Sequence, residues 1–346
     1  MAVQTGQAPR NERDWAALRP DATAASITPL NRPGWALRTL RQDRVRRRRR
    51  PDGAASPAGP VAALRSLRPP LTQPVFVVGA PRSGTTFLGE CFAAVPSVSY
   101  HYEPYATQAA ARMLVQGEWD EDTTAAYFRA TYRHLLQARL AGGRRLVDKT
   151  PAHAFVLPFL ARAFPDAHFV HLLRDGRDAA LSLTERHWIR AAWGATGRRY
   201  PTGELQGPFP QFFVEPERRE QFAQVSDLHR AVWVWRLHTE AARAAAGALG
   251  QRLVEVRYED LVRDPAGQAG RLTDRLGLSG PDARAFLDHA VTIRSGSVAR
   301  WRTAFGPLER VTVEQEAGDL LRRLGYDGQD DDAAPTGGVA RPGREL

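Results

Sequence analysis

The stretch VFVVGAPRSGTTFLGECF, residues 75–92, decides the fold. Its first four residues are an apolar run between Pro74 and Gly79, which is typical of a buried parallel strand. Residues 80–86 form a tight loop, and residues 87–92 have apolar positions at helical spacing. This order of strand, glycine-containing loop and helix is typical of the start of an α/β nucleotide-binding sheet. The segment therefore predicts an α/β, P-loop-type three-layer fold with a central parallel sheet flanked by helices.

A second unit of the same kind follows later in the chain. Residues 168–173 are an apolar strand pattern, Arg174 lies at its carboxyl end, and Asp175 can cap the next helix. A strand is also expected to end near Glu103, and another covers 253–258. Helical patterns occupy three further stretches, residues 123–140, 152–164 and 222–249. Strands alternating with helices agree with a parallel sheet.

The loop after the first strand has the chemistry of an anion cradle. Gly79 and Gly84 are spaced as in nucleotide-hydrolase loops, but Thr85 occupies the position of their lysine. Successive backbone N–H groups, a helix N-terminus and the hydroxyls of Thr85 and Thr86 would face one point, with Arg82 as the cation. Without the lysine that spans the β- and γ-phosphates, the loop suits a nucleotide lacking a γ-phosphate. The alternative is a structural turn with glycine for tightness.

Positive charge is concentrated at the N-terminal end of this 346-residue chain. The net charge is +10, of which residues 1–70 carry +9, and residues 71–346 are almost neutral. The arginine block within residues 44–50 repels itself, and its surroundings are rich in Pro, Ala and Gly. We therefore expect a disordered tail at 1–70, one folded domain at 71–326 and a disordered tail at 327–346. The basic tail would allow loose contact with an anionic membrane surface.

Several classes of protein are excluded by composition. No stretch approaches the ~18 consecutive apolar residues of a membrane-spanning helix. The N-terminal residues lack the apolar core of a secretory signal. Cys91 is the only cysteine, which excludes an internal disulfide and a multi-cysteine zinc site. We expect a cytoplasmic enzyme without a metal.

Two motifs resemble those of a known enzyme family. PRSGTT, residues 81–86, resembles the 5′-phosphosulfate loop of sulfotransferases that use 3′-phosphoadenosine 5′-phosphosulfate (PAPS), in the arginine-containing form of tyrosylprotein and many bacterial sulfotransferases. LLRDGRDAALS, residues 172–182, supplies the family's 3′-phosphate pair as Arg174 and Ser182. A surface pairing of Arg174 with Asp175 or Asp178 is the alternative. The similarity extends over residues 74–325, so that 71–326 becomes a sulfotransferase domain.

The resemblance implies a set of PAPS-binding residues. Tyr258, in RYEDLVRDP at 257–265, matches a tyrosine that lies against the adenine, although a tyrosine at a strand end can also fill the core. Arg300, in SVARWR at 297–302, lies where the family closes a basic clamp over the 3′-phosphate. The implied cofactor-binding residues are Arg82, Ser83, Gly84, Thr85, Thr86, Arg174, Ser182, Tyr258 and Arg300.

The resemblance also implies catalytic residues for sulfuryl transfer. Lys149, in DKTP at 148–151, is the only lysine among 48 basic residues, and with Arg82 it would stabilise charge on the transferred group. Glu103 is expected to be the base, as in tyrosylprotein and some bacterial sulfotransferases, because a partly desolvated carboxylate can have a useful pKa. His101 is the reserve base. The alternative is that Glu103 only braces an arginine.

The acceptor is the part of the function that the sequence leaves open. A hydroxyl or amine of a small-molecule, carbohydrate or lipid acceptor is expected, and the Pro- and Gly-containing segment 194–216 would cover it. One alternative function is a P-loop small-molecule kinase using ATP and Mg²⁺, which the missing loop lysine disfavours. The other is a non-catalytic nucleotide- or nucleic-acid-binding protein. The near-neutral folded part disfavours specific nucleic-acid binding. The oligomeric state is not predicted.

Overall fold

The computed structural model describes six parts of the chain, namely residues 27–28, 31–49, 66–186, 189, 213–294 and 296–326. Residues 1–26, 29–30 and 50–65 of the tail predicted at 1–70, the whole tail predicted at 327–346 and most of segment 194–216 lie outside the described residues. None of the helices in the described ranges has the length and apolar character that crossing a bilayer requires.

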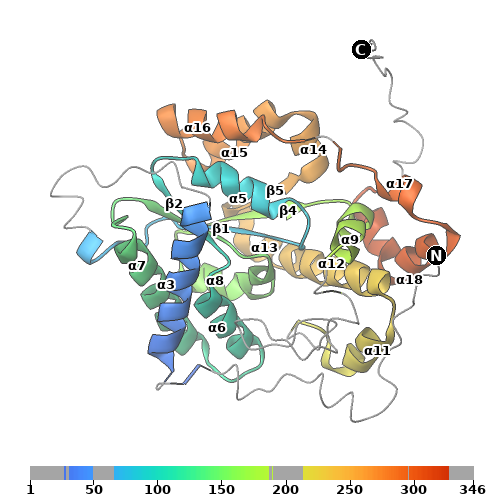
Figure 1. Ribbon diagram of the computed structural model, residues 1–346, viewed down its shortest axis with the longest axis horizontal. Helices are drawn as coiled ribbons and strands as arrows, with labels where there is room; N and C mark the ends of the chain where they lie inside the picture. Colours follow the sequence, from blue (N-terminus) through green and yellow to red (C-terminus); the bar gives the residue numbers. More distant parts are fainter. Residues whose placement is uncertain are drawn as a thin grey trace, which may run out of the picture.

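Five parallel strands form the central sheet in the order β2-β3-β1-β4-β5 (Figure 1). Their bounds are Val75–Gly79 for β1, Val98–Tyr102 for β2, Arg145–Lys149 for β3, His168–Leu173 for β4 and Leu253–Arg257 for β5. Every residue of β1 is buried, as expected for an apolar run inside a parallel sheet. The register pairs Tyr102 with Lys149 and Gly79 with Leu172, so the carboxyl ends of β1 to β4 lie together.

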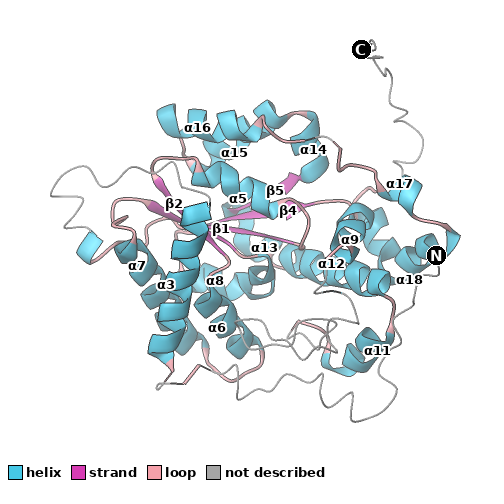
Figure 2. Cartoon of the chain, in the orientation of Figure 1, coloured by secondary structure: helices cyan, strands magenta, loops and turns pink. Residues whose placement is uncertain are grey.

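Helices cover both faces of this sheet (Figure 2), which confirms the predicted three-layer fold. Phe76 and Val78 of β1 point into one core cluster, and Val75 and Val77 point into the opposite one. The first layer contains α3 (Arg32–Arg49), α6 (Tyr105–Val115), α7 (Glu121–Ala138) and α8 (Leu157–Ala163). The second contains α5 (Thr85–Ala93), α14 (Tyr258–Arg263), α15 (Pro265–Leu276) and α16 (Gly280–Ala290).

A third cluster of buried residues lies beside the sheet and includes the tryptophans of the long helix α12. It is built from α9 (Gly176–Thr184), α12 (Asp227–Ala244), α17 (Trp301–Ala304) and α18 (Pro307–Arg323). The remaining segments are α11 (Arg219–Gln224), α13 (Ala246–Leu249) and the 3-10 helices η1 (Pro151–Val156), η3 (Pro216–Arg218) and η4 (Gly250–Arg252).

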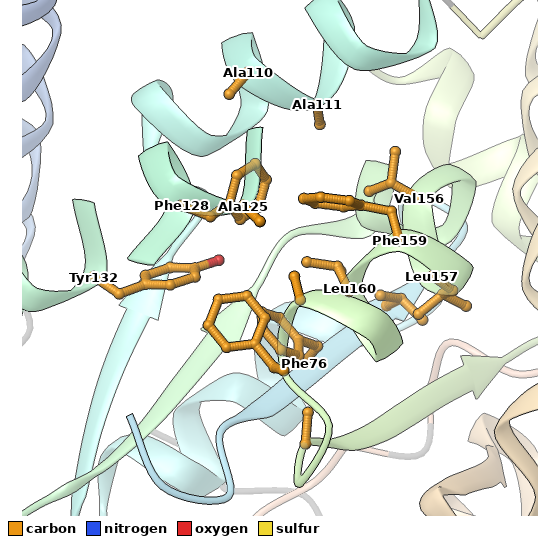
Figure 3. Close-up of a cluster of buried hydrophobic side chains, with 14 of the residues drawn as sticks. Phe76, Ala110, Ala111, Ala125, Phe128, Tyr132, Val156, Leu157, Phe159 and Leu160 are labelled. Atoms are coloured by element: carbon orange, nitrogen blue, oxygen red, sulfur yellow. The ribbon is translucent and has the colours of Figure 1, made fainter. Parts of the chain in front are cut away.

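The core beneath β1 is aromatic (Figure 3). The ring of Phe76 stacks on Phe169 at a centroid distance of 5.6 Å and also packs against Tyr132 of α7 and Phe164. Complete burial of a side chain of this size contributes ~1.5–3 kcal/mol to stability. These contacts fix the position of β1, so the loop that follows it starts from a rigid point.

The predicted elements are confirmed with two differences. The pattern at 123–140 is α7, and the pattern at 222–249 covers α12 and α13. The pattern at 152–164 is divided between η1 and α8. β3 was not predicted as a strand, because three of its five residues, Arg145, Asp148 and Lys149, are charged.

The expectation of a disordered tail at residues 1–70 is wrong for residues 32–49, which form helix α3. Trp35 and Thr39 are buried, and Trp35 joins the core cluster formed with α6 and α7. Gln42 and Asp43 are half-buried on the same face, at the spacing of successive helical turns. The many arginines lie mainly on the other face, so the composition of the segment concealed its buried face.

Candidate active site at the carboxyl end of the sheet

The loop between β1 and α5 has a backbone that few side chains would permit. A Cβ atom at Gly79 would lie 2.4 Å from the carbonyl oxygen of Leu172 on the neighbouring strand. Arg82 and Gly84 both have left-handed backbone conformations, with φ of 70° and 93°. Gly84 is the N-cap of α5, and no side chain caps that helix. The first N–H groups of α5 are therefore available to an anionic ligand.

Arg82, Ser182 and Arg174 are brought together from β1, β4 and α9. Arg82 Nε donates to Ser182 Oγ at 3.1 Å, and an Arg174 guanidinium nitrogen donates to the carbonyl oxygen of Arg82 at 2.7 Å. Arg174 does not pair with Asp175 or Asp178, the alternative considered for it. Asp175 pairs with Arg177, and Asp178 accepts backbone N–H groups. The first phosphate loop and the predicted 3′-phosphate pair are thus one continuous site.

This site carries positive charge that the protein itself does not neutralise well. Burial, followed by the positive charges of Arg186 and Arg174, lowers the pKa of Arg82. Arg174 is 4% exposed, and its Nε lacks a hydrogen-bond partner among the described residues. The hydroxyl of Ser83 in the loop is also buried and also lacks a hydrogen-bond partner among the described residues. Crowded cations and unsatisfied buried donors indicate a place where an anion binds.

Tyr258, the first residue of α14, closes this site on one side. Its ring lies so close to the loop that a Cβ atom on Gly84 would be 2.6 Å from it. The guanidinium carbon of Arg174 lies 4.7 Å from the ring centroid, and the phenol hydroxyl is 2.6 Å from Ser297 Oγ. Tyr258 is buried and contacts both parts of the anion site, and its part in binding the adenine stays a prediction.

Glu103 and Lys149 form an ion pair at the ends of β2 and β3. Lys149 Nζ donates to Glu103 Oε1 at 2.5 Å and to Thr86 Oγ1 of the loop helix at 3.4 Å. The Lys149 side chain is 1% exposed, whereas that of Glu103 is 28% exposed. A partly exposed carboxylate can accept a proton from a bound hydroxyl, and the buried ammonium beside it connects that carboxylate with the phosphate loop.

Two residues of this region were missed by sequence reasoning. Lys149 Nζ and Arg46 Cζ each lie 3.4 Å from the ring centroid of Tyr102. Both cations are therefore within cation–π distance of the same ring. Tyr102 could have been noted from its place next to Glu103, but Arg46 had no signal, because it stands in an arginine-rich segment.

Arg300 and His101 are placed differently from the other predicted residues. Arg300 pairs with Glu185 at 2.8 Å, and both side chains are exposed, so its part in a phosphate clamp stays a prediction. The buried ring of His101 lies between Ser99 Oγ at 3.0 Å and Asp43 Oδ1 at 3.3 Å. Burial lowers the pKa of His101. Both ring nitrogens of His101 are thus engaged within the protein, and its part as reserve base stays a prediction.

Behind the ion pair lie a buried carboxyl and a buried imidazole. Burial raises the pKa of Asp148 to about 6, although Tyr132 donates to it at 2.8 Å. Burial lowers the pKa of His153 to about 3, and its Nδ1 lies 3.5 Å from Asp148 Oδ1. Both side chains are fully enclosed, so we assign them a structural part in holding β3.

The sequence profile of the Sulfotransferase family matches residues 74–282, which is more than half of the chain. The chain belongs to the sulfotransferase family. This confirms the family predicted from the two motifs, and neither the kinase nor the binding-protein alternative is favoured. The profile covers the loop, Glu103, Lys149 and the pair formed by Arg174 and Ser182, and it ends before Arg300.

Two curated relatives of this sulfotransferase-family chain agree with the profile. Nodulation protein NoeE of Sinorhizobium fredii is 32% identical over 298 residues, which cover 75% of this chain and 67% of NoeE. The omega-hydroxy-beta-dihydromenaquinone-9 sulfotransferase Stf3 of Mycobacterium tuberculosis is 28% identical over 209 residues, covering 58% and 46%. The chain thus spans about two thirds of one relative and less than half of the other.

A solved structure agrees at the level of the fold. Sulfotransferase STF9 from Mycobacterium avium aligns with a TM-score of 0.50 and 16% identity, over 86% of each chain. At this identity the match supports the sulfotransferase fold and says nothing about the substrate.

Proposed function

We propose that this member of the sulfotransferase family transfers the sulfuryl group of PAPS to a hydroxyl or amine of a small-molecule, carbohydrate or lipid acceptor. The observation that carries the proposal is the convergence of Arg82, Arg174 and Ser182 beside the uncapped start of α5. Two anion-binding elements in contact suit a nucleotide with phosphates at both its 5′ and 3′ positions. The unsatisfied Ser83 hydroxyl and Arg174 Nε fit such a ligand.

Each residue has a distinct task in this proposal. When bound, PAPS supplies the sulfuryl group and leaves as adenosine 3′,5′-bisphosphate (PAP). Loop residues 82–86 hold the 5′ end through backbone N–H groups, while Arg174 and Ser182 hold the 3′-phosphate. Glu103 takes the proton of the acceptor at its carboxylate. Lys149 and Arg82 offset negative charge as it develops at the transfer site.

The pairing of Lys149 with Glu103 supports this division of work. The ammonium is buried against the carboxylate on one side and lies near Thr86 of the phosphate loop on the other. The proton acceptor and the charge-stabilising group are therefore neighbours, as an in-line transfer between acceptor and donor requires. The alternative expected Glu103 to brace an arginine, and its partner is Lys149; a bracing role toward Lys149 would give the same contact, so turnover has to distinguish the two.

A thermal-shift comparison tests the donor. PAP at about 100 times its Kd should stabilise the protein by ~2.7 kcal/mol without magnesium. AMP, which lacks the 3′-phosphate, and ATP with Mg²⁺ should have much smaller effects at equal concentration. Ser182→Ala should reduce the difference between PAP and AMP. Stabilisation by ATP–Mg²⁺ but not by PAP would instead establish the kinase alternative.

A labelled-donor screen tests the acceptor and the base together. Sulfur-labelled PAPS is incubated with a phenol (2-naphthol), an isoprenoid alcohol (farnesol) and a sugar (methyl glucoside), and the products are identified by mass spectrometry. Glu103→Gln should abolish turnover of whichever compound reacts while PAP affinity stays within about threefold. Loss of PAP affinity in this variant would give Glu103 the bracing role.

The proposal also includes contact with a membrane surface and the location of the enzyme in the cell. Exposed arginines of α3, among them Arg38, Arg41 and Arg44, would allow weak contact with an anionic membrane surface. A cytoplasmic location agrees with the single, buried Cys91. Flotation with phosphatidylglycerol vesicles, compared with phosphatidylcholine vesicles, measures the membrane contact.

A further inference from the structure

Helix α6 begins directly after Glu103, and its start is capped by a different helix. The N-cap residue of α6 is Pro104, which provides no side-chain cap. The backbone N–H of Tyr105 donates instead to Gln42 Oε1 at 3.1 Å, and that of Ala106 donates to Thr39 Oγ1 at 3.0 Å. Both acceptors belong to α3, more than 60 residues earlier in the chain. Helix α3 thus satisfies N–H groups that the local sequence leaves without a partner.

The backbone of Glu103 is held in an unfavourable conformation by the same contacts. Its φ of 46° lies in the left-handed region, which costs a residue with a side chain ~1–2 kcal/mol. Its carbonyl oxygen accepts hydrogen bonds from Gln42 Nε2 at 2.9 Å and from Gln108 Nε2 at 2.7 Å. Its own N–H donates to the carbonyl oxygen of Lys149 at 2.9 Å. Gln42 therefore bonds on both sides of the turn, to Glu103 and to Tyr105.

Helix α3 is itself anchored, so Gln42 has a defined position. Asp43 accepts from Arg139 of α7 at 2.8 Å and lies 3.3 Å from His101 of β2. Burial by itself would raise the pKa of Asp43, but its hydrogen bonds to His101 and Arg139 outweigh that effect and leave the pKa lowered, so Asp43 remains ionised at neutral pH. Trp35, on the same face of α3 about two turns earlier, is 4% exposed in the core. The amide of Gln42 is thus supported by buried contacts on the adjacent turns of α3.

We propose that Gln42 is a positioning residue for the carboxylate of Glu103, and that α3 is a wall of the active site rather than an appended basic segment. The proposal rests on the assignment of Glu103 as the base. Gln42 touches neither donor nor acceptor: it fixes the left-handed turn from which the Glu103 side chain reaches Lys149. This role accounts for a half-buried glutamine on the inner face of a helix whose exposed positions are mostly arginine.

Amide hydrogen exchange tests the positioning without requiring an acceptor. In the PAP-bound protein, Gln42→Met keeps the length of the side chain but removes both hydrogen bonds. The Tyr105 amide should then exchange about fivefold faster or more, the change expected for loss of one average hydrogen bond. Arg41→Gln, on the exposed face of α3, is the matched control and should leave exchange unchanged. Equal exchange in the two variants would refute the positioning.

A double-mutant cycle tests whether Gln42 affects catalysis through Glu103. With the best acceptor of the screen, Gln42→Met should lower kcat about tenfold with KM for PAPS little changed. The partner variant of the cycle is Glu103→Asp, which keeps a shortened carboxylate. In that background Gln42→Met should cause a smaller loss than in the wild type, because a residue that acts through Glu103 has less left to position. An additive loss would assign Gln42 a general structural role. Full activity of Glu103→Gln alone would overturn the assignment of Glu103 as the base, and this proposal with it, while the proposed transfer from PAPS would stand.

A second substitution guards against failure of the methionine variant to fold. Gln42→Glu keeps an acceptor for the Tyr105 N–H but places a carboxylate against the Glu103 carbonyl oxygen. We expect normal exchange at Tyr105, together with a loss of kcat at least as large as that of Gln42→Met. Wild-type turnover in this variant would show that the bond to Glu103 is dispensable and would overturn the proposal.

Discussion

Replacement of Lys149 by arginine is the sharpest test of the chemistry proposed for this site. The ammonium lies 2.5 Å from Glu103 Oε1, 3.4 Å from Thr86 Oγ1 and 3.4 Å from the centroid of the Tyr102 ring. With 1% of the side chain exposed, the enclosed space suits a compact ammonium and excludes a planar guanidinium. Although all the other residues among the lysines and arginines of the chain are arginine, replacement of Lys149 by arginine should therefore not be tolerated.

The expected loss of kcat follows from the role of the Lys149 ammonium, which stabilises negative charge at the transfer site. Loss of one preorganised charge-stabilising donor costs about 10²–10³ in kcat, or ~3–4 kcal/mol. Lys149→Met should lose this full factor, and Lys149→Arg should come within tenfold of it. For Lys149→Met the effect on folding should be smaller than the effect on kcat, because the partly exposed Glu103 carboxylate can be rehydrated. Lys149→Arg should in addition destabilise the fold by ~1–3 kcal/mol, the cost of overfilling a packed site.

Steady-state kinetics measure the loss of kcat, and calorimetry measures PAP affinity separately. PAP lacks the sulfuryl group, so its affinity should change little in either variant. An arginine variant within twofold of the wild-type kcat would refute the reasoning, as would a methionine variant that loses PAP affinity as strongly as turnover. The single lysine also allows a chemical check. An amine-reactive reagent should label Lys149 and the α-amino group alone, and PAP should slow the labelling of Lys149.

Three further predictions concern the phosphate site and the core. Arg174→Gln should weaken PAP binding about 10–100-fold, the loss expected for a charged hydrogen bond, while AMP affinity measured by calorimetry stays unchanged. Gly84→Ala should abolish PAP binding, because its Cβ atom would lie 2.6 Å from the Tyr258 ring. Gly117→Ala, with a similar φ and open surroundings, is its control and should bind PAP normally. His153 has its pKa lowered from 6.5 to about 3, so the unfolded chain gains protons first as the pH falls. Between pH 7 and 5, protonation of His153 in the unfolded chain should lower the free energy of unfolding by ~2 kcal/mol. Urea unfolding at the two pH values should no longer show this contribution in His153→Phe. An equal acid loss in that variant would contradict the burial argument.

The sequence alone determined the features that depend on neighbouring residues. The apolar run at 75–78 and the glycine-containing loop after it predicted a buried parallel strand and an anion-binding turn, because backbone conformation there is set locally. The spacing of Arg174 and Ser182 predicted a strand end and the first turns of a helix for the same reason. The Sulfotransferase family profile then confirmed the family that these motifs indicated.

Contacts between distant segments were decided only by the tertiary structure. Arg82 meets Ser182 across 100 residues, and Gln42 meets Glu103 across 61. Arg300 lies in the expected stretch of sequence, but its guanidinium is paired with Glu185. Helix α3 shows the limit most clearly, since its arginines dominate the composition while a few residues on one face decide where it docks. Composition and periodicity average over neighbours, whereas such a contact depends on the packing of two elements whose relative position no local pattern encodes.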